Sequence, residues 1–258
     1  MSLTLYVDQG NYLAFKILIA AEYNGINIQI PPFKKGETKV ASPLGKYPAM
    51  KTSHGMLFES NAIARYISRM RADSSLYGES FYESGLIDSW IDFCSSEIEP
   101  AATNWYYPLL GYISYNESSR DKAKTDLGKT LEILEKELNT NKDTKTFLIN
   151  DNITLADITI VSALIYPFKF VATSEYRDQY PTVMNWFTTC ISQKEFKAIV
   201  GSVILCEREI IPIDNNDSNS NSNSNSNSIG SSTSNENDIA AIQNKMMDLA
   251  VQTPPPAP

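Results

Sequence analysis

A proline that opens a strand, followed one hairpin later by an acidic residue and a serine that open a helix, constrains this chain more than any other feature. Pro48 precedes the short run 49–52, and a second short run, residues 56–58, follows a tight turn. Glu59 and Ser60 come next, ahead of apolar residues spaced as on one face of a helix. The pattern predicts two strands joined by a turn and then a helix with a polar start.

Alternating and helical patterns extend this unit on its N-terminal side. Residues 3–7 are predicted to form a strand, residues 11–23 a helix ended by Asn24 and Gly25, and residues 26–30 a second strand stopped by two prolines. With the hairpin and its helix added, the order is β-α-β, a loop, and then β-β-α. That order is typical of a thioredoxin-like domain.

Two further details of this first domain are predicted. The polar stretch of residues 34–46 is expected to form an irregular loop. Ser60 is expected to cap the helix after the hairpin, and the buried face of that helix is expected to carry Ile63, Tyr66, Ile67 and Met70.

Beyond residue 78 every periodic segment is helical. Apolar residues recur at helical spacing in two stretches, namely Leu86, Ile87, Trp90, Ile91 and Cys94, and then Leu127, Leu131, Leu134 and Leu138. Thr154 and Asp157 match a capping box, and the apolar helix that follows them is expected to end at Pro167. The sequence thus predicts an α/β, thioredoxin-like domain over residues 1–72 and an all-helical domain over residues 79–210.

The composition changes sharply near residue 214. From there an Asn/Ser repeat begins, which cannot bury enough apolar surface to offset the entropy lost on ordering, so residues 214–258 are predicted to be disordered. Half of the net charge of −8 lies there, because five acidic residues face one lysine. A short helix that folds only on binding is predicted over residues 238–250, and a nascent helix without a partner is the alternative. Its apolar stripe is Ile239, Ile242, Met246 and Leu249.

Composition excludes several classes of function. The chain is acidic and has no basic stripe, which argues against nucleic-acid binding. Its three cysteines are widely spaced and its single histidine, His54, lies in a turn, so neither a disulfide framework nor a metal site is predicted. No apolar run approaches the roughly 18 residues that a membrane span needs, and a cytoplasmic location is expected. Glu97 and Glu99 lie near a helix end and are expected to be solvated.

Several segments together resemble a known family. They are residues 14–16, 58–64, 98–101, 154–159, 186–191, 196–201 and 205–207. They resemble the glutathione-transferase-like domain of the gamma subunits of eukaryotic translation elongation factor 1, over about residues 3–209. Those subunits carry a Lys-rich linker and a second globular domain, whereas here an Asn/Ser repeat runs to Pro258. The chain is either a fragment or a divergent paralogue that keeps only this module.

The resemblance implies a glutathione site at the hairpin. In the transferase fold the proline equivalent to Pro48 is cis. The backbone of Tyr47 is expected to pair with the cysteinyl part of glutathione. Glu59 and Ser60 are expected to receive its γ-glutamyl end, because free amides at a helix start favour a carboxylate.

The resemblance also places the group that activates the thiol just after the first strand. Here that position holds Asn11, whose neutral amide is a feeble activator of a thiolate. Tyr12 and Tyr6 are nearby hydroxyls. We therefore expect low or no transferase activity, with Asn11 and Tyr12 as weak candidates for catalysis.

The function that the resemblance implies is binding. We expect a non-catalytic scaffold subunit of the elongation factor 1 complex, which binds the nucleotide-exchange subunits and requires no cofactor. One alternative is a glutathione transferase that conjugates glutathione to electrophiles. Another is an adaptor in an aminoacyl-tRNA synthetase assembly, and a homodimer is compatible with each.

Overall fold

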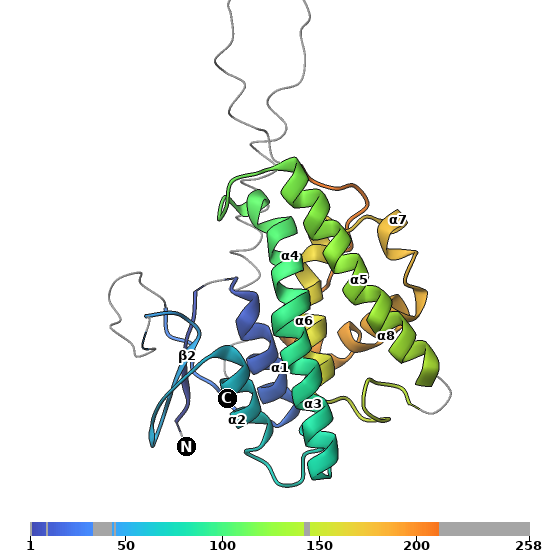
Figure 1. The fold of residues 1–258 in the computed structure, drawn as a ribbon. Helices are drawn as coiled ribbons and strands as arrows, with labels where there is room; N and C mark the ends of the chain where they lie inside the picture. Colours follow the sequence, from blue (N-terminus) through green and yellow to red (C-terminus); the bar gives the residue numbers. More distant parts are fainter. Residues whose placement is uncertain (1, 9, 33–42, 44, 142–144, 212–258) are drawn as a thin grey trace, which may run out of the picture.

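A small sheet lies at one side of the molecule, α1 (Phe15–Tyr23) and α2 (Ser60–Ser68) lie beside it, and the other helices form the rest of the body (Figure 1). The computed structural model describes residues 2–8, 10–32, 43, 45–141 and 145–211. Most of the predicted loop over residues 34–46, and all of the predicted tail helix over residues 238–250, lie outside the described residues. The predicted combination of an α/β part and an all-helical part is confirmed.

Three short antiparallel strands form the sheet. Their order is β1 (Thr4–Tyr6), β2 (Ala49–Thr52) and β3 (Gly55–Phe58). The predicted hairpin between β2 and β3 is confirmed, and Thr52 and Gly55 pair next to its turn.

Residues 26–30 do not form the predicted second strand. One isolated parallel bridge joins Gln29 to Thr4. The amide of Gln29 donates to the carbonyl of Leu3 at 2.9 Å, and its own carbonyl accepts from the amide of Leu5 at 2.8 Å. The next residue that faces β1 is Pro31, which has no amide hydrogen, so the ladder stops after one residue.

The helix predicted over residues 11–23 forms in two pieces, a 3₁₀ turn (Tyr12–Ala14) and then α1 (Phe15–Tyr23), and it ends at Asn24 as predicted. The helix after the hairpin is α2 (Ser60–Ser68), and the expectation that Ser60 caps it is wrong. Glu59 holds the N-cap position and Ser60 is the first helical residue. Glu59 has a φ of 67°, which turns the chain abruptly from β3 into α2 and moves the helix boundary by one residue.

The helical part begins with one long, continuous helical segment, the rod, which contains a π-helical turn. It consists of α3 (Phe81–Phe93), a π-helical turn (Cys94–Ile98) and α4 (Glu99–Tyr106). The amide of Glu99 bonds to the carbonyl of Cys94, five residues back. Pro100 follows and has no amide to continue the regular pattern, which explains why the helix widens at this point.

The remaining helices complete this part. They are a 3₁₀ turn (Tyr107–Leu110), α5 (Glu117–Asn141), α6 (Leu155–Phe170), α7 (Ser174–Arg177), α8 (Pro181–Ile191) and α9 (Lys194–Val200). Of these, α8 packs against α6, α5 packs against α4 and α8, and α9 packs against α1. The prediction that Pro167 ends α6 is wrong, because the helix continues for three more residues. Nearly every residue of α6 is buried, and this packing offsets the one hydrogen bond that the proline removes.

The capping box predicted at the start of α6 is confirmed. The Asp157 carboxylate is fully buried and accepts from the amide and hydroxyl of Thr154, at 2.9 and 2.8 Å. It also accepts from the amide of Leu148 at 2.9 Å and from Nε1 of Trp186 at 3.0 Å. One side chain thus joins the start of α6 to the preceding loop and to α8.

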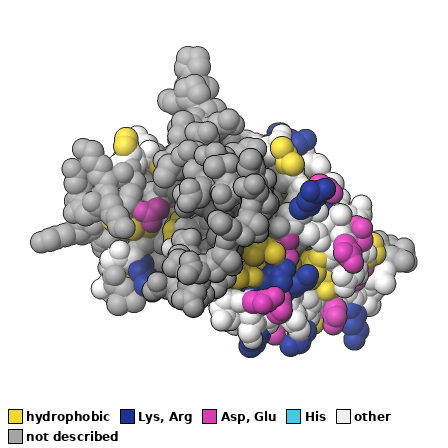
Figure 2. Space-filling model, turned by 90° about the horizontal axis from the view of Figure 1, so that it is seen from above, with side chains coloured by type: hydrophobic (Ala, Val, Ile, Leu, Met, Phe, Trp, Pro, Cys, Tyr) yellow, Lys and Arg dark blue, Asp and Glu magenta, His cyan; other side chains and the backbone are white. Residues whose placement is uncertain are grey.

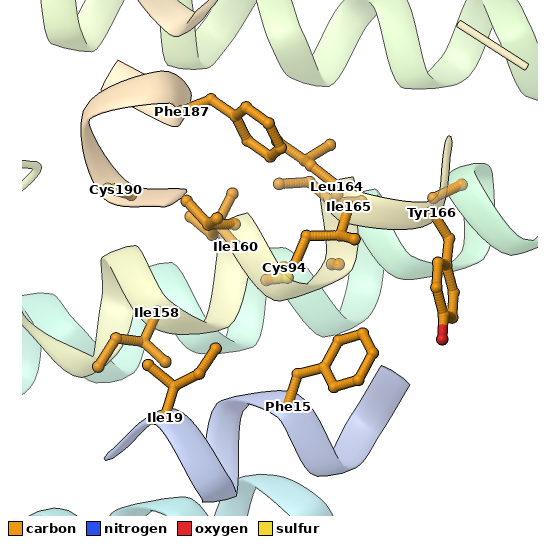
Figure 3. Close-up of a cluster of buried hydrophobic side chains, with 14 of the residues drawn as sticks. Phe15, Ile19, Cys94, Ile158, Ile160, Leu164, Ile165, Tyr166, Phe187 and Cys190 are labelled. Atoms are coloured by element: carbon orange, nitrogen blue, oxygen red, sulfur yellow. The ribbon is translucent and has the colours of Figure 1, made fainter. Parts of the chain in front are cut away.

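One continuous apolar core runs through both parts of the molecule. Figure 3 shows Phe15 and Ile19 of α1 directed toward Ile158 and Ile165 of α6, with side chains of α8 beyond them. The three cysteines are free and buried. Within the described residues, no helix is both long and apolar enough to cross a membrane, and no group of acidic, Cys and His side chains could hold a metal ion.

Candidate functional site

The sheet register brings the predicted binding residues to one end of the sheet. Tyr6, Ala49 and Phe58 are paired across the three strands. Pro48 precedes Ala49 and Glu59 follows Phe58, so both lie at that same end. The Tyr47–Pro48 peptide bond is cis, as the resemblance implies.

The start of α2 lies at this end of the sheet. Glu59 is exposed, and Ser60 is 8% exposed. The first amide of this region with a helical acceptor is that of Ile63, which bonds to the carbonyl of Glu59. The amides before it are available to an anion, and the helix dipole favours one there. This geometry is compatible with the expected γ-glutamyl site, which stays a prediction.

The two weak candidates for catalysis lie in different surroundings, and those of Tyr12 do not favour a thiolate. Asn11 caps the 3₁₀ turn, and its Oδ1 accepts from the amide of Leu13 at 3.0 Å. Burial raises the pKa of the Tyr12 hydroxyl far above its ordinary value, and the nearby charge of Glu99 raises it further. An environment that disfavours a phenolate also disfavours a thiolate beside it. Conjugation at or near background therefore remains the expectation.

A buried charged cluster lies where α1, α2 and α4 meet, and the sequence did not predict it. Lys16 is 1% exposed, and its Nζ donates to Oε1 of Glu99 at 3.0 Å and to Oδ1 of Asn61 at 2.5 Å. Nδ2 of Asn61 in turn donates to Oγ of Ser95 at 2.7 Å. The expectation that Glu99 is solvated is wrong. A lysine flanked by apolar residues on both sides was the available signal.

An open groove of about 860 Å³ lies on the outer side of the rod, between α4 and α5. Its apolar lining comprises Phe93, Pro100, Ala101, Pro108, Ile113, Ala123 and Ile133. Ile133 is 49% exposed and Ile113 is 42% exposed, so two large aliphatic side chains of the groove are open to solvent. Charged residues line it as well, and Asp126 pairs with both Lys122 and Lys129. We name this feature the α4–α5 groove.

Charges of both signs are mixed on the coloured part of one face of the molecule (Figure 2). On the face that Figure 2 shows, Lys and Arg side chains lie among Asp and Glu side chains, with hydrophobic side chains between them. A surface of this kind lacks the single-sign field that attracts a phosphate backbone. The argument against nucleic-acid binding stays a prediction.

The aromatic residues at the end of α4 and just beyond it divide between inside and outside. Trp105 and Tyr106 are buried, whereas Tyr112 is exposed. Nε1 of Trp105 donates to Glu209 at 2.7 Å, and Nε of Arg120 donates to the same carboxylate at 2.7 Å. Glu209 thereby attaches the last described segment of the chain to α4 and α5.

Comparison with known proteins identifies two matching family models and a set of similar proteins. Residues 1–69 match the family model described as glutathione S-transferase, N-terminal domain, and residues 96–194 match that of the C-terminal domain. Elongation factor 1-gamma of Carassius auratus is 39% identical over 216 residues, which cover 80% of this chain and 47% of the relative. The probable elongation factor 1-gamma 1 of Arabidopsis thaliana is 39% identical over 210 residues, covering 79% and 50%.

Solved structures show the same fold. The GST-like domain of elongation factor 1-gamma from Saccharomyces cerevisiae has a TM-score of 0.70 at 23% identity, covering 82% of this chain and 99% of that one. Glutathione transferase F2 from Populus trichocarpa has a TM-score of 0.66 at 24% identity, covering 76% and 95%. The resemblance that the motifs indicated is confirmed. The chain spans about half the length of the curated relatives it matches.

Proposed function

This chain belongs to the glutathione S-transferase family, and we propose that it acts as a non-catalytic scaffold in a translation elongation factor 1 complex. Its relatives at 37–39% identity are named elongation factor 1-gamma, which supports this assignment. We propose the nucleotide-exchange subunits of that factor as its partners and the cytoplasm as its location. The mechanism is binding, without a cofactor and without covalent chemistry.

The α4–α5 groove is the observation that carries the proposal. A groove lined by both apolar and charged side chains is the kind of surface expected to bind a protein. Ile133 and Ile113 expose large aliphatic side chains that a partner could cover. The charged pairs of Asp126 with two lysines lie at the same groove, where they can orient a partner without adding much affinity.

Affinity purification of the full chain from native extract tests the proposal. We expect elongation factor 1 exchange-factor subunits to be recovered and identified by mass spectrometry. Ile133→Glu places a charge in the groove and is expected to lower their recovery at least about tenfold, the cost of burying an uncompensated charge. Ile204→Glu is the matched control, because Ile204 is 68% exposed and lies outside the groove. A clean homodimer with none of these subunits would contradict the proposal.

The sheet end supports a second candidate function, a glutathione transferase that acts on electrophiles. Here glutathione would be a ligand at Tyr47, Pro48, Glu59 and Ser60. A conjugation assay with glutathione tests it. Robust turnover that is lost on Asn11→Ala or Tyr12→Phe would favour the enzyme over the scaffold. Recovery of an aminoacyl-tRNA synthetase in the purification, in place of exchange-factor subunits, would favour the adaptor.

A further inference from the structure

The Lys16 ammonium is a buried charge that requires its partners. Lysine is almost never fully buried unless it is paired, because taking an ammonium group out of water is costly. Here the pairing comes from two other helices, through Glu99 at the first residue of α4 and Asn61 in the first turn of α2. One side chain of α1 thus binds both helices at once.

The start of α4 contacts Lys16 on one side and lines the α4–α5 groove on the other. Glu99 is 16% exposed at its side chain and faces Lys16. Its neighbours Glu97, Pro100 and Ala101 line the α4–α5 groove. The start of α4 therefore has an inner face fixed by a charge from α1 and an outer face that shapes the groove.

The turn just before α4 is locally weak. Residues 94–98 form a π-helical turn, a rare conformation that leaves a helix less regular and often occurs at functional sites. Pro100 removes a further backbone hydrogen bond from the same region. The backbone of this turn lacks the regular α-helical bonds, so its geometry depends more on side-chain contacts than that of a regular helix does. Besides the packing of the buried Cys94 and Ile98, two side-chain bonds join this region to other helices, from Lys16 to Glu99 and from Asn61 to Ser95 inside the π-helical turn.

We propose that Lys16 is a positioning residue for the α4–α5 groove. Through Glu99 directly, and through Asn61 and Ser95, its buried ammonium fixes the π-helical turn and the start of α4 in the form that a partner binds. This inference rests on the proposed function. It makes partner binding depend on a charge contributed by the thioredoxin-like part, although no residue of that part lines the groove.

Amide hydrogen exchange of the whole chain tests the positioning role without a partner. In Lys16→Met we expect amides of residues 94–104 to exchange at least about tenfold faster than in the wild type, because the turn loses its inner support. Lys51→Met is the matched control, since Lys51 is exposed on β2, and it is expected to leave these amides unchanged. Asn61→Ala removes one arm of the cluster and is expected to show the same local effect, more weakly. It takes the place of Lys16→Met should that variant fail to fold.

A double variant separates positioning from stability. Lys16→Met with Glu99→Gln no longer strands a buried carboxylate, so its urea midpoint is expected to recover toward that of the wild type. Exchange over residues 94–104 is expected to stay fast, because the bond that held the turn is still absent. Faster exchange spread evenly over the chain, or recovery of both quantities together, would overturn the proposal and leave Lys16 with a stabilising role only.

Partner binding provides the last measurement. The exchange-factor subunits recovered with the wild type are expected to bind Lys16→Met, and the double variant, about tenfold more weakly than Lys51→Met. Unchanged affinity together with fast local exchange would also overturn the proposal. Failure of the wild type to recover any exchange-factor subunit would refute the proposed function instead, while the exchange result would still decide whether Lys16 fixes the turn.

Discussion

Loss of the Asp157 side chain should lower the free energy of unfolding by a large amount. Its carboxylate accepts four hydrogen bonds, from Leu148, from Trp186 and twice from Thr154. Asp157→Ala leaves three buried N–H donors without an acceptor. Each such orphaned donor costs about 1–3 kcal/mol. Removing a buried carboxylate returns part of its desolvation cost, so we expect a net loss of about 4 kcal/mol.

A loss of this size is a large fraction of the roughly 5–15 kcal/mol that stabilises a typical folded protein. Equilibrium unfolding in urea, followed by tryptophan fluorescence, measures it. With a slope of about 2.5 kcal/mol per M for a protein of this size, the midpoint should fall by about 1.5 M. Trp186 reports directly, because its indole bonds to the deleted carboxylate.

Two companion variants sharpen the measurement. Asp151→Ala removes an exposed carboxylate that bonds to Thr146 in the same loop, and it should cost less than about 1 kcal/mol. Asp157→Asn keeps one acceptor oxygen and should fall between the wild type and Asp157→Ala. If Asp157→Ala cost no more than Asp151→Ala, the argument from orphaned buried donors would be wrong.

Three further predictions follow from groups away from the capping box. Burial raises the pKa of the thiols of Cys94, Cys190 and Cys206. A thiol reagent at pH 8 should therefore modify the native protein slowly, and should modify all three cysteines rapidly after denaturation. Rapid modification of the native protein would contradict this. Hydrogen bonds from Lys122 and Lys129 lower the pKa of Asp126, so its contribution to stability is present above its unfolded pKa of about 4 and is lost as pH falls through the lower folded value. The stability difference between wild type and Asp126→Asn in urea should therefore shrink from pH 7 to pH 3, and a widening difference would show the wrong sign. Glu209→Ala leaves Arg120 and the Trp105 indole without their shared acceptor and should cost about 2–3 kcal/mol in the same unfolding assay, against no measurable change for Glu207→Ala, an exposed neighbour.

Features that depend on residues close in sequence were predictable. The capping box spans Thr154 to Asp157, so both partners lie within four residues, and their spacing alone predicts the hydrogen bonds between them. The hairpin and the end of α1 at Asn24 were found for the same reason. Even here tertiary packing changed two boundaries. The positive φ of Glu59 moved the start of α2, and the burial of α6 carried that helix past Pro167.

Features that depend on distant residues were missed. Lys16 and Glu99 are 83 positions apart, and although the apolar neighbours of Lys16 hint at burial, nothing in the sequence pairs the two residues. Only the fold shows that the two meet, and that the turn containing Glu99 also lines a groove. The strand expected over residues 26–30 failed differently, because alternation signals a half-buried segment but does not reveal how many of its amides find a partner.

The continuous apolar core has a consequence for how this molecule can be divided. The sequence suggests a cut in the linker after residue 72, yet Phe15 and Ile19 on one side of that cut pack against α6 on the other (Figure 3). Cleavage there would expose complementary hydrophobic surfaces on both fragments, which would favour aggregation over independent folding. The linker thus separates two patterns of secondary structure within a single cooperative unit, and either half could be exchanged between relatives only if the facing side chains were exchanged with it.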